Sequence, residues 1–225
     1  MATLVLILLA IYGAFAPAPE TTRAPKAAVK PETEGSAGPR SAASPGKLLV
    51  VGDSLAQATE GPLAGLLPGW HIATSASQGR HTGDGVADIA SRSSLPGVIF
   101  VSLGTNDNPS ETDTFASYVE QVLDAAGPSR CVVWANIARP PYGGVSYSGY
   151  NQVLNRLSYA RPNLTVVDWA GITRSQPGLL GSDGVHATSE GYAVRAQAMA
   201  SAISTCGGVQ AYGGSAGGSA GVPGD

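Results

Sequence analysis

The stretch LLVVGDSL, residues 48–55, joins an apolar run to a short turn that carries a serine. Consecutive aliphatic residues are typical of a strand that is buried on both faces of a sheet. The residues that follow, 55–67, have the apolar spacing of an amphipathic helix. This segment therefore predicts a strand, a tight turn and a helix, with Ser54 at the start of the helix.

The same order of strand and helix recurs along the chain. Strands are expected at residues 48–51, 70–74, 98–103, 131–136 and 164–168, and helices at 55–67, 85–91, 114–126, 149–160 and 189–205. The strands are continuous Val, Ile and Leu runs rather than alternating patterns, as in parallel sheets covered by helices on both faces. The pattern predicts an α/β fold, a three-layer αβα sandwich on a flavodoxin-like five-stranded parallel sheet. Ligands of such sheets bind beyond the carboxyl ends of the strands.

The chain of 225 residues divides by composition into four parts. Residues 1–18 are almost wholly apolar, which indicates a signal peptide or a short membrane anchor. No Lys or Arg precedes this run, and Pro17 and Pro19 follow the candidate small-residue cleavage sites, so cleavage stays open. Residues 19–46 form a Pro/Ala-rich linker and residues 207–225 a Gly/Ser tail, both expected to be disordered. One domain is expected at 47–206.

The charge of this domain is sparse and slightly acidic. From residue 48 onward the chain has 8 Arg, no Lys and 13 Asp plus Glu. A basic stripe that could displace counterions from a phosphate backbone is missing, so nucleic acid is not an expected partner. We expect a monomer that meets the membrane only through its N-terminal segment.

Cys131 and Cys206 are the only cysteines. Cys131 begins an expected strand and Cys206 ends the last expected helix. Helices run antiparallel to strands in such layered folds, so the two cysteines are expected at the same edge of the sheet. A disulfide between them would indicate an oxidising, extracytoplasmic location, whether the protein is secreted or membrane-anchored. The alternative is a pair of buried free thiols.

Ser54 lies where a nucleophile would be useful, at a strand-to-helix turn on the ligand-binding edge. A serine at this position is also a common helix N-cap, so the tripeptide Gly-Asp-Ser alone does not decide between the two roles. Other residues at the same edge favour catalysis. Gly79 follows the second strand and Asn106 follows the third.

A serine nucleophile needs hydrogen-bond donors aimed at the oxyanion of its tetrahedral intermediate. The Ser54 and Gly79 backbone N–H groups and the Asn106 side chain could form this oxyanion hole. Asp183 and His186 precede the last helix, at a spacing that allows Asp183 to orient His186 while His186 accepts the Ser54 proton. These residues predict a triad of Ser54, His186 and Asp183.

The motifs GDSL at 52–55, a glycine at 79, GTND at 104–107 and DGVH at 183–186 resemble the four blocks of the SGNH/GDSL hydrolases, in the same order. The resemblance covers about residues 47–205. It implies that Ser54, Gly79, Asn106 and His186 are the four residues that name the family. Through Asn136, the segments 161–163 and 167–169, and the DGVHATSEGY ending, the chain most resembles extracytoplasmic SGNH domains of envelope-polysaccharide acyltransferases.

These observations predict a serine esterase that hydrolyses small acyl esters, with acetyl expected, on carbohydrate or cell-envelope substrates. Two alternatives stay open, an O-acyltransferase with a sugar hydroxyl as acceptor and a non-catalytic envelope-binding module. No cofactor is expected. A metal site is not expected either, because no His pair has ligand spacing and the cysteines are far apart. The Gly-Lys-Ser/Thr ending of a phosphate loop is also missing.

Three further residues are expected to border the substrate, namely Asp53, His81 and Tyr142. Tyr142 or Trp169 could stack on a sugar face, although both are equally typical of ordinary packing. His71 begins a strand and is expected to be structural. A long apolar lid is not evident, which favours a small acyl group over a lipid chain.

Overall fold

The structure is a computed structural model that describes residues 46–210, with side chains through Cys206. Five strands form one sheet: β1 (Lys47–Gly52), β2 (His71–Ala76), β3 (Val98–Ser102), β4 (Cys131–Ala135) and β5 (Leu164–Val167). The helices are α1 (Ser54–Leu66), α2 (Thr82–Ser91), α3 (Thr112–Ala126), α4 (Ser148–Ala160), α5 (Trp169–Ser175), the 3-10 turn η1 (Pro177–Leu179) and α6 (Ser189–Gln210).

The sheet has the strand order β2-β1-β3-β4-β5, and all four pairings are parallel. The flavodoxin-like parallel sheet predicted from the sequence is therefore confirmed. In the register, Gly52 at the end of β1 lies opposite Ala76 of β2 and Ser102 of β3. The loops that follow these three strands consequently start at the same level, side by side.

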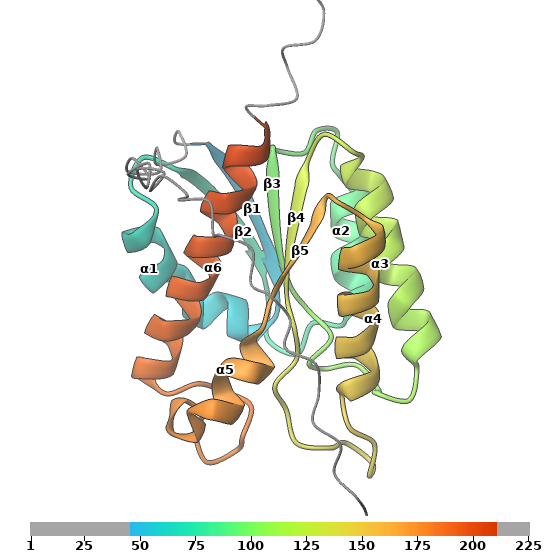
Figure 1. Ribbon diagram of the computed structural model, residues 1–225, viewed down its shortest axis with the longest axis vertical. Coiled ribbons are helices and arrows are strands. Elements are labelled where there is room, and N and C mark those ends of the chain that lie inside the picture. Colours follow the sequence, from blue (N-terminus) through green and yellow to red (C-terminus); the bar gives the residue numbers. More distant parts are fainter. Residues whose placement is uncertain (1–45, 211–225) are drawn as a thin grey trace, which may run out of the picture. The chain divides into compact units, whose positions relative to one another are not determined.

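Helices cover both faces of the sheet, α1 and α6 on one and α2, α3 and α4 on the other (Figure 1). Each face has its own apolar core. Strand residues that point to one face, such as Val101 and Trp134, pack with α2, α3 and α4. Strand residues that point to the other, such as Phe100 and Val133, pack with α1 and α6. Because β3 and β4 are buried on both faces, they are continuously apolar.

The helices differ from the expectation mainly at their ends. Helix α2 begins at Thr82 rather than Gly85, and α5 was not predicted. Helix α5 begins where the Asp168 side chain accepts a hydrogen bond from Gly171 N–H. Because the helix has only seven residues, its sequence shows little periodicity. Helix α6 continues to Gln210, beyond the end expected at residue 205. Glycine weakens a helix by about 1 kcal/mol per residue but does not forbid its last turn. The expected leader, the linker to residue 45 and the tail from 211 lie outside the described residues.

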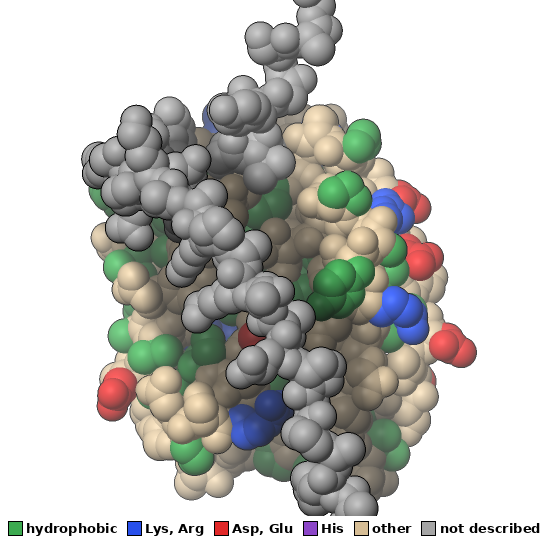
Figure 2. Space-filling view, viewed as in Figure 1, with side chains coloured by type: hydrophobic (Ala, Val, Ile, Leu, Met, Phe, Trp, Pro, Cys, Tyr) green, Lys and Arg blue, Asp and Glu red, His purple; other side chains and the backbone are tan. Residues whose placement is uncertain are grey.

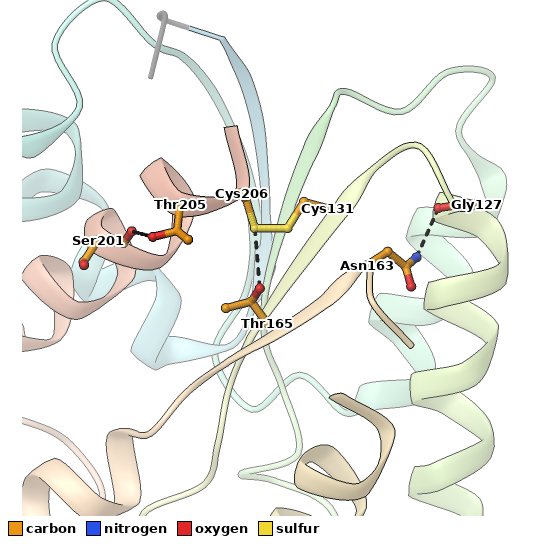
Figure 3. The surroundings of a disulfide bond; sticks show 7 residues. All are labelled: Gly127, Cys131, Asn163, Thr165, Ser201, Thr205 and Cys206. Atoms are coloured by element: carbon orange, nitrogen blue, oxygen red, sulfur yellow. Dashed lines mark hydrogen bonds between the residues drawn. A yellow bond between two sulfur atoms is a disulfide. The ribbon is translucent and has the colours of Figure 1, made fainter. Parts of the chain in front are cut away.

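A disulfide joins Cys131 at the start of β4 to Cys206 in α6, with 5.8 Å between their Cα atoms (Figure 3). The Cys206 sulfur of this disulfide also lies 3.7 Å from Thr165 Oγ1 of β5. This bond sits at the amino ends of the strands. It is therefore at the edge of the sheet opposite to the loops that follow Gly52, Ala76 and Ser102.

The surface carries few charges. On the face in Figure 2, red and blue side chains gather along the margin formed by α3 and α4. One pair in this region joins Arg161 to Asp124 at 2.6 Å. Among the helices within residues 46–210, none is long and apolar enough to span a bilayer.

Candidate active site

The nucleophile turn is shaped by Gly52 and Asp53. An ideal Cβ on Gly52 would lie 2.3 Å from Ala56 Cβ, so only glycine lets β1 pass this closely under α1. Asp53 is the N-cap of α1, and its Oδ1 accepts a hydrogen bond from Leu55 N–H at 2.9 Å. Ser54 is consequently the first residue of the helix, where backbone N–H groups have no intrahelical acceptor.

Asp183 and His186 come from the tight loop before α6. Gly184 has a φ of +67°, a left-handed conformation that glycine adopts without strain. The Val185 and His186 backbone N–H groups donate to Asp183 Oδ1 at 2.9 and 3.0 Å. The loop closes through Gly181 N–H, which donates to the His186 carbonyl at 2.7 Å. The backbone of this loop therefore holds the Asp183 carboxylate in place independently of its contact with the His186 imidazole.

The three residues form one chain of hydrogen bonds. Asp183 Oδ2 lies 2.7 Å from His186 Nδ1, and His186 Nε2 lies 3.0 Å from Ser54 Oγ. With the imidazole proton on Nδ1, Nε2 accepts the serine proton. The side-chain hydrogen bond from His186, together with the two backbone N–H groups, lowers the pKa of Asp183 to about 2. Asp183 therefore stays ionised at any pH where the imidazole would work as a base.

Gly79 and Asn106 reach the same place from the loops after β2 and β3, the two strands that flank β1. Gly79 has a φ of +69° in the turn after β2, where Arg80 N–H donates to the Ser77 carbonyl at 3.3 Å. The Asn106 amide nitrogen lies 3.4 Å from Asp53 Oδ2 and 3.3 Å from the Arg80 carbonyl. The Asn106 side chain is thus held between the β1 and β2 loops. This arrangement can offer donors to an anionic oxygen near Ser54.

A hollow of about 620 Å³ lies over these groups, and we call it the Ser54 hollow. It brings together Ser54, Gly79, Asn106 and His186. Four further lining residues were not predicted, namely Gln57, Ala58, Gln78 and Tyr192. Gln57 and Ala58 lie three and four residues after Ser54, so helical spacing could have indicated them. Tyr192 in the first turn of α6 gave no such signal.

The residues that were expected to contact the substrate lie in different surroundings in the structure. Asp53 is fully buried, so the expectation that it touches substrate is wrong; it caps α1 instead. Trp169 is 1% exposed and cannot stack on a sugar. Tyr142 is exposed but does not line the Ser54 hollow, and it lies beside the Arg139 guanidinium. His81 lines a second, adjacent hollow.

Sequence reasoning also missed Arg195, a fully buried cation in α6. Its Nη2 donates to Ser102 Oγ at 2.7 Å, and its guanidinium lies 5.4 Å from the Trp169 ring centre. Burial lowers the pKa of Arg195 to about 10, while attraction to the Asp53 carboxylate opposes the shift. Burial raises the pKa of Asp53, and Arg195 opposes that shift. The nucleophile turn therefore rests on a buried pair of opposite charges.

The sheet order, the two helical layers and the placement of these loops define the fold as that of the SGNH hydrolases. Solved structures that share this fold include the following three. The C-terminal catalytic domain of peptidoglycan O-acetyltransferase A from Streptococcus pneumoniae has a TM-score of 0.61 and 20% identity, covering 72% of this chain and 94% of that one. A Slackia heliotrinireducens protein assigned as an SGNH hydrolase gives 0.58 and 19%, covering 71% and 99%. A family 3 carbohydrate esterase from Clostridium thermocellum gives 0.58 and 18%, covering 73% and 98%. No sequence profile of a known family and no curated protein sequence matches the chain.

Proposed function

We propose that the chain is a serine esterase of the SGNH/GDSL type that removes small acyl groups, with acetyl expected, from carbohydrate or cell-envelope esters. The observation that carries this proposal is the hydrogen-bonded chain from Ser54 through His186 to Asp183, of which Ser54 and His186 line the Ser54 hollow. Gly79 and Asn106 border the same hollow, which supports a role in binding the oxyanion.

The reaction proceeds by double displacement. His186 Nε2 takes the proton from Ser54 Oγ as Oγ bonds to the ester carbonyl carbon. The carbonyl electrons move to the oxygen, which the Ser54 and Gly79 N–H groups and the Asn106 amide stabilise. As the tetrahedral intermediate collapses, the departing alcohol receives the proton from His186 and an acyl-serine remains. Water then attacks the acyl carbon and gives its proton to His186. As the second tetrahedral intermediate collapses, the bond between the acyl carbon and Ser54 Oγ breaks, His186 returns the proton to Oγ, and the acid is released.

The primary test compares p-nitrophenyl acetate hydrolysis by the wild type with that of Ser54→Ala. Turnover should fall by several orders of magnitude in the variant while its circular dichroism spectrum stays unchanged. Asp183→Asn should be milder, because it leaves the nucleophile and base in place. Unchanged activity in Ser54→Ala would refute the assignment, and full activity in Asp183→Asn would remove that residue from the triad.

An O-acyltransferase uses the same residues, with a sugar hydroxyl in place of water. The likeness to a peptidoglycan O-acetyltransferase supports keeping this second candidate. Acetate release from acetylated polysaccharides, measured with and without a second sugar, separates the two. If the added sugar becomes acetylated and free acetate declines, transfer is the main reaction; if acetate release is unaffected, hydrolysis is.

A non-catalytic envelope-binding module is the candidate of another class. A fluorophosphonate probe bonds only to an activated serine, so labelling that disappears in Ser54→Ala supports catalysis. A wild type that stays unlabelled would favour the binding module.

We further propose an extracytoplasmic location, with the protein acting as a monomer. The Cys131–Cys206 bond supports the location, since such bonds persist in oxidising compartments. Expression with residues 1–46 fused to a reporter that is active only after export tests it, and light scattering tests the oligomeric state.

A further inference from the structure

A second hollow of about 440 Å³ lies beside the Ser54 hollow, and we call it the His81 hollow. The two hollows border the same two loops. Gly79 and Asn106 line the first, whereas His81 and Asp107 line the second. Asn106 and Asp107 are consecutive, so a group that fills the His81 hollow lies next to an ester bound at Ser54.

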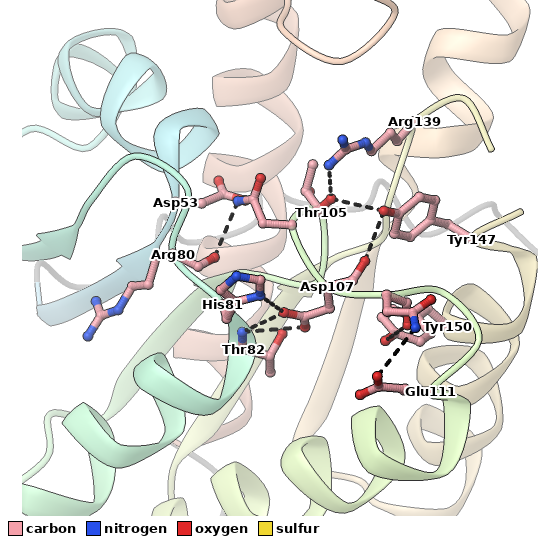
Figure 4. A network of polar contacts seen from close by, with 12 residues as sticks. Asp53, Arg80, His81, Thr82, Thr105, Asp107, Glu111, Arg139, Tyr147 and Tyr150 are labelled. Atoms are coloured by element: carbon pink, nitrogen blue, oxygen red, sulfur yellow. Dashed lines mark hydrogen bonds and ion pairs between the residues drawn. The ribbon is translucent and has the colours of Figure 1, made fainter. Parts of the chain in front are cut away.

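The imidazole of His81 is held in place by Asp107. His81 Nδ1 lies 2.9 Å from Asp107 Oδ1, and Thr82 N–H donates to both oxygens of this carboxylate at 3.1 and 3.3 Å (Figure 4). The His81 side chain is 63% exposed. Because the side chain is largely exposed, His81 Nε2 is accessible to a ligand.

The walls of the His81 hollow offer further acceptors and a donor. Asp84 in the first turn of α2 and Glu111 at the start of α3 supply carboxylates. The Tyr118 hydroxyl reaches over Gly83, where an ideal Cβ would lie 2.9 Å from its oxygen. In the part of the chain that the structure describes, no hydrogen bond joins the Asp84 carboxylate or the Tyr118 hydroxyl to another residue. These groups are available to a ligand.

The charge of the His81 hollow narrows the class of ligand. Three carboxylates line it, from Asp84, Asp107 and Glu111, while no Lys or Arg does. An anionic ligand would be repelled. A purely cationic ligand would need acceptors alone, but the Tyr118 hydroxyl can also donate. The His81 imidazole donates its Nδ1 proton to Asp107, so its Nε2 offers an acceptor. Mixed donors and acceptors beside aromatic side chains suit a ring with several hydroxyl groups.

We propose that the His81 hollow is a subsite for an uncharged sugar ring that carries the acyl group, so that the sugar is the alcohol half of the ester. This proposal rests on the esterase function proposed for Ser54. The Asp84 carboxylate accepts hydrogen bonds from sugar hydroxyls, and the Tyr118 hydroxyl and His81 Nε2 complete the set. The acyl group then points into the Ser54 hollow.

The experiment measures kcat and KM for three acetate esters: p-nitrophenyl acetate, a mono-O-acetylated methyl glucoside and acetylcholine. Asp84→Asn and Tyr118→Phe should each lower kcat/KM for the glucoside ester about five- to tenfold through KM, as expected when one polar contact to the ligand is lost. Both should leave p-nitrophenyl acetate hydrolysis within twofold, because that ester has no sugar ring.

Asp113→Asn is the matched control, since Asp113 is an exposed carboxylate in the first turn of α3 and does not line the hollow. It should change neither ester. Equal effects of Asp84→Asn and Asp113→Asn on the glucoside ester would overturn the subsite. A loss confined to acetylcholine would overturn it in favour of an ammonium site. A wild type that does not hydrolyse p-nitrophenyl acetate would instead overturn the esterase proposal, whereas normal hydrolysis with unaltered glucoside kinetics overturns the subsite alone.

Discussion

At the scale of single residues, Asp183 is both an orienting group and a charge stabilised by its own loop. Its two oxygens receive hydrogen bonds from the His186 ring and from two backbone N–H groups. All of these contacts favour the ionised form and hold the pKa of Asp183 near 2. Because the side chain is half exposed, solvent screens much of the interaction.

This depressed pKa predicts how stability depends on pH. A carboxyl whose pKa is lower in the folded than in the unfolded state stabilises the fold above its ordinary value, and the effect disappears as the pH falls through the folded value. The melting temperature of the wild type should exceed that of Asp183→Asn at pH 5, and the difference should close between pH 4 and pH 2. Differential scanning calorimetry across this range provides the measurement. A difference that stays constant to pH 2 would contradict the assignment.

A second residue-scale feature is the buried pair of Asp53 and Arg195. Neither side chain meets solvent, and each stabilises the charge of the other against the cost of burial. Two guanidinium nitrogens of Arg195, Nε and Nη1, form no hydrogen bond within residues 46–210. The pair thus depends on electrostatic attraction in a region of low dielectric constant.

Removing one member of this pair should lower the free energy of unfolding much more than removing both. Arg195→Met should lower the free energy of unfolding by about 3–5 kcal/mol, because it leaves a buried carboxylate without a cation. Its stability should also rise as the pH is lowered, since the pKa of Asp53 is raised in the folded state and protonation removes the uncompensated charge. Urea unfolding at several pH values measures both effects.

The double variant Asp53→Asn/Arg195→Met is the control for this prediction. It removes both charges but keeps the side-chain oxygen that caps α1, so it should recover a large part of the loss. If the double variant is as unstable as the sum of the two single variants, the two residues do not act as a pair.

At the scale of elements, the β1–α1 junction sets the position of the nucleophile. Gly52 lets the strand pass under the helix, and Asp53 caps the helix one residue later. Strand β3 supports the junction from the side, since Asp53 N–H donates to the Ser102 carbonyl at 3.2 Å. A shift of this junction would move Ser54 away from His186.

Gly52→Ala should therefore reduce both stability and activity. The added methyl group would lie 2.3 Å from Ala56 Cβ and 3.0 Å from the Ser102 carbonyl oxygen, and neither atom belongs to a flexible side chain. We expect a loss of about 1–3 kcal/mol in the free energy of unfolding and a lower kcat for p-nitrophenyl acetate.

Gly61→Ala provides the comparison, because Gly61 lies within α1 with no atom within 4 Å of the new Cβ. This variant should be as stable as the wild type or more stable by up to about 1 kcal/mol, with unchanged kcat. Similar melting curves for the two variants would show that Gly52 is not sterically required.

At the scale of the whole domain, the disulfide and the site occupy opposite ends of the sheet. Cys131 begins β4, and Ser54 lies two residues after the end of β1. The bond ties α6 to the central part of the sheet across 75 residues of sequence. It should thus stabilise the domain without shaping the active site.

The double variant Cys131→Ala/Cys206→Ala should lose about 4 kcal/mol of stability, the value expected for opening a loop of this length. At temperatures where it stays folded, its kcat/KM for p-nitrophenyl acetate should match the wild type. Guanidinium unfolding and initial rates at 15 °C measure these quantities. A large fall in kcat/KM with the fold intact would show that the bond also shapes the site.

The sequence by itself determined the architecture and the identity of the residues at its ligand-binding edge. Strands buried on both faces require unbroken apolar runs, and this periodicity is local, so β1, β3 and β4 were evident without coordinates. The residues after these strands were then expected to meet, because carboxyl ends of parallel strands share one edge. That rule placed Ser54, Gly79 and Asn106 together, and the short Asp183–His186 spacing completed the set.

Tertiary structure alone decided which polar side chains face solvent and which are buried. Asp53 looked like a substrate contact beside Ser54, yet its side chain turns inward to Arg195, which is 142 positions away in the chain. Trp169 looked like a sugar platform and lies in the core, while His81 and Asp107 form a second hollow. Burial depends on contacts between distant segments, which no local pattern encodes. The same reason explains why sequence reasoning found the nucleophile but missed the buried charge pair beneath it.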